Sequence, residues 1–246
     1  MNNRISQTLV LLSVFFLSIQ VGNSQKIYFW LDAGLKVSAG SGMLYNNNLI
    51  NDRNIDPSFG STYGIGGKLG FNFGQYHAFT IDGMYSRIGQ KNDIRLESGG
   101  DVTTRQIGWN SADIFLMYRY NRNLNYVEIG AKYSLYQQRL ESINQGTSKP
   151  VNDTYVDNMI SPVLGFGYYM FNADAFTANL GFRLSYGIYD LLTVSGIETQ
   201  AFTEPREYEN YASTNPAFIE LVLELNFGLG QYAKSVCGKR ASFMGM

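Results

Sequence analysis

Apolar and polar residues alternate along most of the chain, with the period of two that is typical of β-strands having one apolar and one polar face. The most regular stretch is 219–227, where every second residue is Ile, Leu or Phe. Seven similar stretches precede it, although 163–171 is apolar on both faces apart from Gly165 and Gly167. We therefore predict eight strands. They cover 27–38, 63–73, 78–90, 112–120, 127–135, 163–171, 176–187 and 219–227.

The connections between these stretches alternate between long and short. Three are short and rich in turn-forming residues, at 74–77, 121–125 and 172–175. The long ones cover 39–58, 91–105, 141–154 and 193–216. An even number of strands with this alternation predicts an all-β fold, an eight-stranded antiparallel up-and-down transmembrane β-barrel with both termini on the side of the short turns. The strand lengths suit a membrane, since a tilted strand crosses it in about 9 to 11 residues.

The composition of the polar face decides what surrounds the barrel. This face carries Gly and Ser at many positions, such as Gly64, Gly66, Gly130 and Ser86, where a water-exposed face would carry Lys and Glu. Small residues suit the interior of a narrow eight-stranded barrel. The other face carries bulky apolar residues, as a lipid-facing band does. Only 16% of the chain is charged and 15% is aromatic. A soluble, lipocalin-like binding protein is the alternative interpretation.

The first 24 residues have the pattern of a secretory signal peptide. Arg4 gives the positive start, the apolar stretch 9–19 follows, and the small residues Gly22 and Ser24 precede a predicted cut before Gln25. The stretch is too short to span a membrane as a helix. The predicted organisation is a signal peptide at 1–24, a barrel at 25–227 and a short periplasmic tail at 228–246.

Charge and chemistry-bearing residues argue against several functions. A net charge of −1 gives no basic surface for nucleic acid. Cys237 is the only cysteine, so neither an intrachain disulfide nor a cysteine zinc site is expected. The only histidine, His77, lies in a short turn, far from the long loops where a catalytic barrel would need a general base. We predict no enzyme activity, no catalytic or metal-ligating residues and no cofactor.

Eleven charged residues fall on the face assigned to the interior. They are Asp32, Lys36, Lys68, Asp82, Asp113, Arg119, Glu128, Lys132, Arg183, Glu220 and Glu224. Acids and bases are nearly balanced, and an unpaired charge enclosed in a narrow barrel is costly, so we expect them to pair across the interior. Such pairing predicts a closed lumen, with a narrow porin as the alternative.

The chain resembles the small eight-stranded outer-membrane barrels of the OmpA and OmpX type over roughly residues 26–227. In its last strand, Leu221, Leu223, Leu225 and Phe227 resemble the carboxy-terminal signal that the barrel-assembly machinery recognises, although 19 residues follow Phe227. The resemblance implies the outer membrane of a Gram-negative bacterium, both termini in the periplasm, and contact with outer-membrane lipids and the assembly machinery. It implies little about activity, because one fold hosts many functions.

Recognition is expected in the long loops, where rigid scaffolds usually carry it. The loop at 193–216 holds four glutamates among aromatic residues, and a protein or glycan partner would bind there. The predicted function is a structural, adhesion or envelope-complex role performed through these loops. The favoured interpretation of the tail is a loosely held segment, and the alternative is that Lys234, Cys237, Lys239 and Arg240 contact anionic headgroups, peptidoglycan or a periplasmic partner.

Overall fold

The computed structural model describes residues 29–52, 55–57, 59–74, 76–95, 102–143, 149–151, 153–172, 176–199 and 208–229. The predicted signal peptide and nearly all of the predicted tail lie outside these residues. No helix among them is both long enough and apolar enough to cross a membrane.

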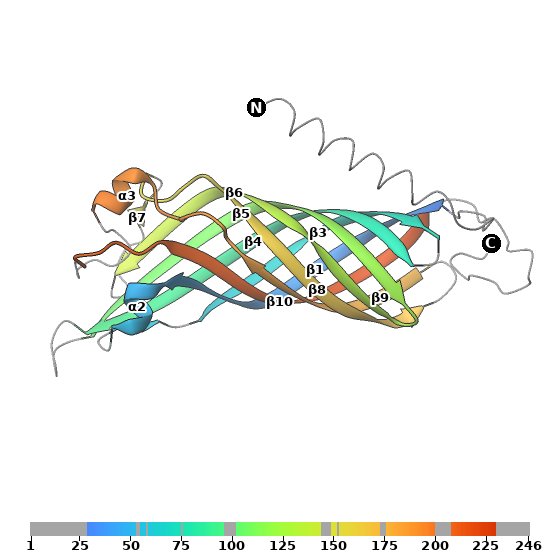
Figure 1. Cartoon of the computed structure of the whole chain (residues 1–246), viewed down its shortest axis with the longest axis horizontal. Coiled ribbons are helices and arrows are strands. Elements are labelled where there is room, and N and C mark those ends of the chain that lie inside the picture. Colours follow the sequence, from blue (N-terminus) through green and yellow to red (C-terminus); the bar gives the residue numbers. More distant parts are fainter. Residues whose placement is uncertain are drawn as a thin grey trace, which may run out of the picture.

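Eight long strands of the described chain form a closed antiparallel ring (Figure 1). In ring order they are β1 (Phe29–Asn46), β3 (Gly60–Phe73), β4 (His77–Arg95), β5 (Val102–Arg122), β6 (Asn125–Ile143), β8 (Asn158–Asn172), β9 (Phe176–Tyr186) and β10 (Thr214–Leu229). The first and last strands close the ring through continuous antiparallel pairing from Leu31 with Leu229 to Asn46 with Thr214. The predicted eight-stranded up-and-down barrel is confirmed.

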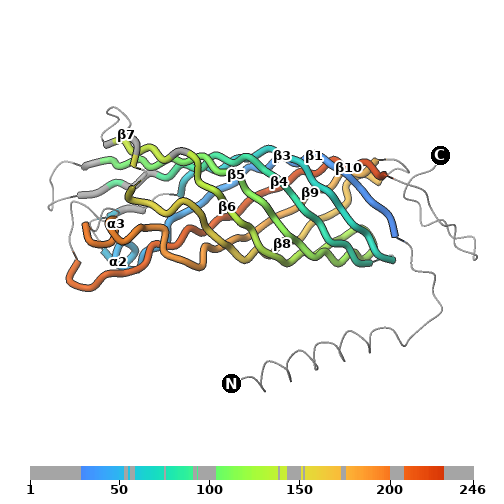
Figure 2. The backbone as a smooth tube through the Cα atoms, turned by 90° about the horizontal axis from the view of Figure 1, so that it is seen from above, coloured from blue at the N-terminus to red at the C-terminus, as the bar shows by residue number. Residues whose placement is uncertain are grey.

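The two ends of the barrel differ. Short connections join β3 to β4, β5 to β6 and β8 to β9 at the end where β1 begins and β10 ends, which we call the turn end. The opposite loop end carries the longer connections, with the helices α2 (Asn47–Asn51) and α3 (Val194–Glu198) and the short strands β2 (Ile55–Pro57) and β7 (Lys149–Pro150). Figure 2 shows both helices gathered at this end.

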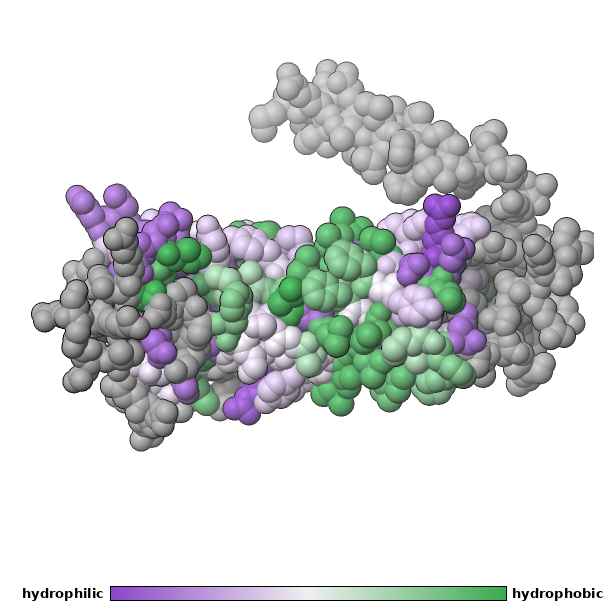
Figure 3. Space-filling view, turned by 90° about the horizontal axis from the view of Figure 1, so that it is seen from below, coloured by the Kyte–Doolittle hydropathy of each residue, from purple (hydrophilic) through white to green (hydrophobic). Residues whose placement is uncertain are grey.

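The outer face of the strands is apolar. Leu35 on β1, Ile65 on β3 and Ile129 on β6 expose 62%, 64% and 59% of their surface, whereas the alternate residues face inward and are mostly buried polar or charged groups. On the side drawn in Figure 3, apolar residues gather around the barrel between more hydrophilic ends. A soluble barrel has the reverse polarity, because its outer face meets water. The exterior is that of a transmembrane barrel.

Aromatic residues mark the turn end of the exterior. Phe29 contacts Phe73, which contacts Phe79, and Phe79 lies against Tyr118, with ring centroids 5.2 to 6.0 Å apart. On the other side of β1, Phe227 contacts Phe176 at 5.3 Å. Such rings form the girdle of a transmembrane barrel at the membrane interface.

The strands extend further toward the loop end than the sequence pattern predicts. β1 ends at Asn46, not at residue 38, and β4 ends at Arg95, not at residue 90. Toward the loop end the inward residues become apolar, as at Leu44 and Ile88, while outward Arg87 is exposed. The contrast between the two faces is therefore lost although the strands continue to pair. At the turn end β10 runs to Leu229, two residues past the predicted end of the barrel.

Candidate functional site

The barrel interior contains three zones. A polar pocket, which we call the vestibule, lies at the turn end. A cluster of ion pairs occupies the central part, and an apolar core fills the loop end. The alternation of the eight strands builds the first two zones and part of the third, because every second side chain points inward.

The central zone is a continuous set of ion pairs, the ion network. Its members in the described chain are Asp32, Lys36, Lys68, Asp82, Arg119, Glu128, Arg183 and Glu224. These four acids and four bases balance, so the network as a whole carries no net charge. All but Asp32 are at most 5% exposed.

Glu224 of β10 is the centre of the network. Its carboxylate lies 2.7 Å from Lys36 Nζ and 2.6 Å from Arg119 Nη2, and Lys68 Nζ approaches it at 3.4 Å. It also accepts a hydrogen bond from the Asn179 amide at 3.3 Å. One carboxylate thus connects cations from three strands, β1, β3 and β5.

Two further acids join the bases into one continuous network. Asp82 of β4 binds Lys36 at 2.5 Å and Arg183 at 2.8 Å. Glu128 of β6 binds Arg183 at 2.5 Å and Arg119 at 2.8 Å. The chain of contacts therefore passes from β1 through β4, β9, β6 and β5 to β10, and crosses the lumen.

Aromatic side chains and glycines complete this zone. The Arg119 guanidinium lies 3.9 Å from the ring centroid of Tyr126, which points inward and is 2% exposed. Gly167 and Gly181 stand beside the Tyr126 side chain, and a Cβ added at Gly167 would lie 2.2 Å from the ring, and one at Gly181 2.2 Å from the hydroxyl. Sequence reasoning missed Tyr126, although extending the alternation of 127–135 by one residue would have found it.

Three of the eleven interior charges predicted from the sequence lie apart from the network. Glu220 accepts a hydrogen bond from Ser38 at 3.1 Å, and Lys132 lies 4.4 Å from the ring centroid of Phe218. Asp113 is buried and pairs in register with Ser134 of β6. Within the described residues none of the three takes part in an ion pair.

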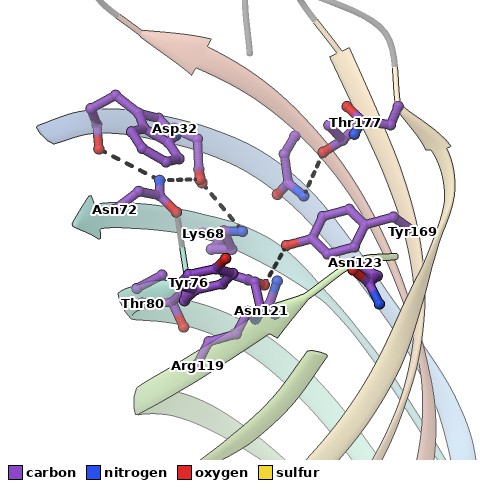
Figure 4. A pocket seen from close by; sticks show the side chains of 14 residues that line it. Asp32, Lys68, Asn72, Tyr76, Thr80, Arg119, Asn121, Asn123, Tyr169 and Thr177 are labelled. Atoms are coloured by element: carbon purple, nitrogen blue, oxygen red, sulfur yellow. Dashed lines mark hydrogen bonds and ion pairs between the residues drawn. The ribbon is translucent and has the colours of Figure 1, made fainter. Parts of the chain in front are cut away.

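The vestibule is a pocket of about 100 Å³ at the turn end (Figure 4). Lys68 and Arg119 of the ion network lie on its lining, together with Asp32. Asn72 donates a hydrogen bond to Asp32 at 2.8 Å, and Tyr169 donates one to Asn121 at 2.7 Å (Figure 4). Exposed Tyr76 and Asn123 also line the pocket.

An apolar core occupies the interior at the loop end. Its buried members include Leu44, Leu49, Ile55, Ile88, Ile107, Trp109, Tyr136, Tyr155, Met159, Leu191, Leu192 and Phe218. They come from the strand ends and from the connections, including α2. The sequence pattern assigned several of them to loops, so this core was not predicted.

A β-bulge places one cation in this core. Asn110 of β5 pairs with Gln138 of β6, but the next residue, Ser111, pairs with Tyr136. Gln137 is therefore an extra residue in β6, and Arg139 faces inward as Tyr136 does. The Arg139 guanidinium donates to the Tyr155 carbonyl at 2.9 Å and binds Asp157 at 2.5 Å. Burial raises the pKa of the Tyr155 phenol beside it.

Hydrogen bonds attach the loops to the strand ends. Asn46 caps α2 by accepting from the amides of Asn48 and Leu49, and its own amide donates to Thr214. Tyr211 donates to Asp190, and partial burial together with this bond raises the pKa of the Tyr211 phenol. The described parts of the connections are thus packed against the strand ends.

The remaining candidate residues lie on the exterior. His77 is the first residue of β4, at the turn end, with Nδ1 2.6 Å from the Tyr118 hydroxyl. Leu221, Leu223, Leu225 and Phe227 occupy successive outward positions of β10. No group of three possible metal-ligating side chains was found among the residues that the structure describes.

Fold and polarity together define a small eight-stranded transmembrane barrel of the outer-membrane type. No protein-family model matches the sequence, and no curated protein sequence matches it. Among solved structures, the chain is similar to the attachment invasion locus protein Ail of Yersinia pestis, at 10% identity and a TM-score of 0.39, covering 81% of this chain and 99% of that one.

Two other solved structures are also similar. Neisserial surface protein A has 12% identity and a TM-score of 0.42, covering 79% of this chain and 96% of that chain. The outer-membrane protease OmpT from Escherichia coli has 9% identity and a TM-score of 0.36, covering 82% and 96%. These likenesses do not bear on the activity or ligand of this chain.

Proposed function

We propose that this protein is a non-conducting outer-membrane barrel that holds its loop end as a rigid platform for a protein partner outside the cell. The observation that carries the proposal is the filling of the lumen. The ion network crosses its central part and the apolar core occupies its loop end, and both support a closed lumen. A hydrated ion would have to displace balanced ion pairs and then pass through an apolar core.

The location follows from the exterior and from the predicted signal peptide. An apolar outer face suits hydrocarbon, and closed barrels cross membranes without unpaired backbone groups. Short turns face the periplasm in barrels of this kind, and this supports an orientation with both termini in the periplasm and the longer connections outside the cell. The outward leucines of β10 and Phe227 then serve as the signal for the assembly machinery.

A partner would meet apolar groups at the loop end. Val194 of α3 exposes 73% of its surface, and Phe59, just before β3, exposes 72%. Exposed apolar groups on a packed, tethered surface favour a protein partner, and such residues often anchor interfaces. The single histidine is at the other end of the barrel, so an imidazole does not serve as a base at this surface, and we propose a non-enzymatic role.

Conductance tests the closed lumen. Purified protein reconstituted into a planar bilayer is expected to leave the conductance at the level of protein-free detergent, while an open porin in the same bilayer gives discrete steps. Insertion is checked in parallel by the different migration of unheated and boiled samples on a detergent gel. Steady single-channel steps from the inserted protein would establish a narrow porin instead.

Cysteine labelling tests the orientation and the exposure of the loop end. In a Cys237→Ser background, Val194→Cys is expected to react with a membrane-impermeant maleimide on intact cells. Asn125→Cys, an exposed position at the start of β6 at the turn end, is the matched control and should react only after the outer membrane is permeabilised. The reverse pattern would place the loops in the periplasm and contradict the proposed platform outside the cell.

A further inference from the structure

Asparagine is the most frequent residue on the lining of the vestibule. Five asparagines contribute to it in the described chain, namely Asn72, Asn121, Asn123, Asn172 and Asn226. Each amide offers both donors and an acceptor. Asn123 and Asn172 are exposed at the mouth, whereas Asn72 and Asn226 are buried at 7% and 4% exposure. A ligand entering from the turn end would therefore meet neutral hydrogen-bonding groups at several depths.

The charges on the lining are already balanced. Lys68 lies 3.2 Å from Asp32 and also approaches Glu224, while Arg119 is held between Glu224 and Glu128. An anion would compete with these buried carboxylates, and a cation would compete with the two bases. The vestibule therefore favours a neutral ligand.

Three oxygen atoms on lining residues have no hydrogen-bond partner in the described structure, and one of them, Asp32 Oδ1, lies in the ion pair with Lys68. The other two are Thr80 Oγ1 and Asn226 Oδ1, on residues that are 2% and 4% exposed. Buried polar atoms are normally satisfied, so each indicates a position where a small adjustment could admit a donor from a bound molecule. A hydroxyl group can supply such a donor.

Three aromatic rings, those of Trp30, Tyr76 and Tyr169, also line the vestibule. The Tyr76 and Tyr169 rings are both visible among the amides in Figure 4. Ring faces offer apolar surface for C–H groups, whereas the amides suit hydroxyls. The volume of about 100 Å³ is below the roughly 300 Å³ of pockets for drug-sized ligands.

We propose that the vestibule binds one ring of a saccharide from the turn-end side. A sugar ring is neutral, carries several hydroxyls that both donate and accept, and has a C–H face that stacks on aromatic rings. The ligand could be a free sugar or a terminal residue of a cell-wall glycan, since both present this chemistry on the periplasmic side. This site is independent of the loop end and of the partner proposed there.

Tryptophan fluorescence can report binding, because the chain has two tryptophans and only Trp30 lines the vestibule. The Trp109→Phe variant isolates its signal, and it removes an indole N–H that has no hydrogen-bond partner in the described structure. Titration of this variant in detergent with N-acetylglucosamine and with glucose is expected to give a saturable change in the millimolar range. Acetate, a small anion, is expected to give none.

Two variants and a matched control locate the site. Thr80→Val keeps the shape but removes a hydroxyl, and Tyr76→Ala removes a ring at the mouth. Each is expected to weaken sugar binding about tenfold, the effect of losing one good contact. Asn125→Ala changes an exposed turn-end asparagine outside the vestibule and should leave binding unchanged. All variants are first checked for the gel shift of the folded barrel.

Cosedimentation with purified cell-wall sacculi separates the two sources. If the protein binds the free sugars and also cosediments with sacculi, and Tyr76→Ala abolishes the cosedimentation, the ligand is a wall glycan. If it binds only the free sugars, the ligand is a soluble sugar. The proposal is overturned if neither sugar nor sacculi bind, if acetate binds as well as sugar, or if Thr80→Val and Tyr76→Ala both bind like the parent.

Discussion

Replacing Glu224 by Gln is expected to destabilise the barrel by about 3 kcal/mol or more, the usual cost of breaking a buried ion pair from one side. Gln keeps the shape and can still accept a hydrogen bond. It removes the charge that faces Lys36, Arg119 and Lys68, so the ion network is left with four cations and three carboxylates. Urea unfolding of the protein in lipid vesicles, followed by the gel shift, measures the change in free energy.

Glu220→Gln is the matched control for this experiment. Glu220 lies on the same strand and also points inward, but its described contact is a hydrogen bond from Ser38, which Gln can also accept. Its expected effect is about 1 kcal/mol or less. Equal losses in the two variants would show that removing any inward charge destabilises the barrel. The ion network would then contribute no more to the free energy of unfolding than an isolated carboxylate does.

Leu35→Arg is expected to cost about 2 to 4 kcal/mol, the penalty of a cation on the lipid face near the middle of the membrane. Leu35 exposes 62% of its surface and lies within the apolar stretch of β1, between Leu31 and Val37 on the outward face. Unfolding in vesicles measures the loss. A barrel surrounded by water would tolerate this substitution.

Tyr45→Arg provides the control for depth. Tyr45 is on the outward face of the same strand and is exposed, but it lies one residue before the end of β1 at the loop end. There the expected cost falls to about 0 to 1 kcal/mol. If both variants were as stable as the parent, the result would contradict a membrane around the barrel. If both lost about 2 to 4 kcal/mol, the hydrocarbon layer would have to extend to the loop end of β1.

The interior was partly predictable because alternation decides which side chains point inward. It placed Glu224, Arg119 and Lys36 on one face, but a one-dimensional pattern has no information on which charges meet. That depends on the stagger of the strands, which brings Glu224 of β10 to Arg119, four strands away in the ring. The same stagger leaves Asp113 and Lys132 apart from the network.

The loop end and the vestibule were not predicted, for two physical reasons. The bulge at Gln137 reverses the alternation and turns Arg139 inward. A search for strict period two cannot locate such a bulge, because the bulge changes the phase of the pattern. The vestibule combines residues from distant strands, such as Asn72 of β3 and Tyr169 of β8. Their proximity exists only once the ring is closed.

The sequence by itself determined the strand count, the barrel class and the polarity of its two faces, because these depend on local alternation and on the lengths of the connections. Only the tertiary structure decided how the lumen is filled. It places the ion network across the centre, an apolar core toward the loops and an amide-lined vestibule at the turn end. Closure and stagger of the ring set these contacts, since they join residues that are far apart in the chain.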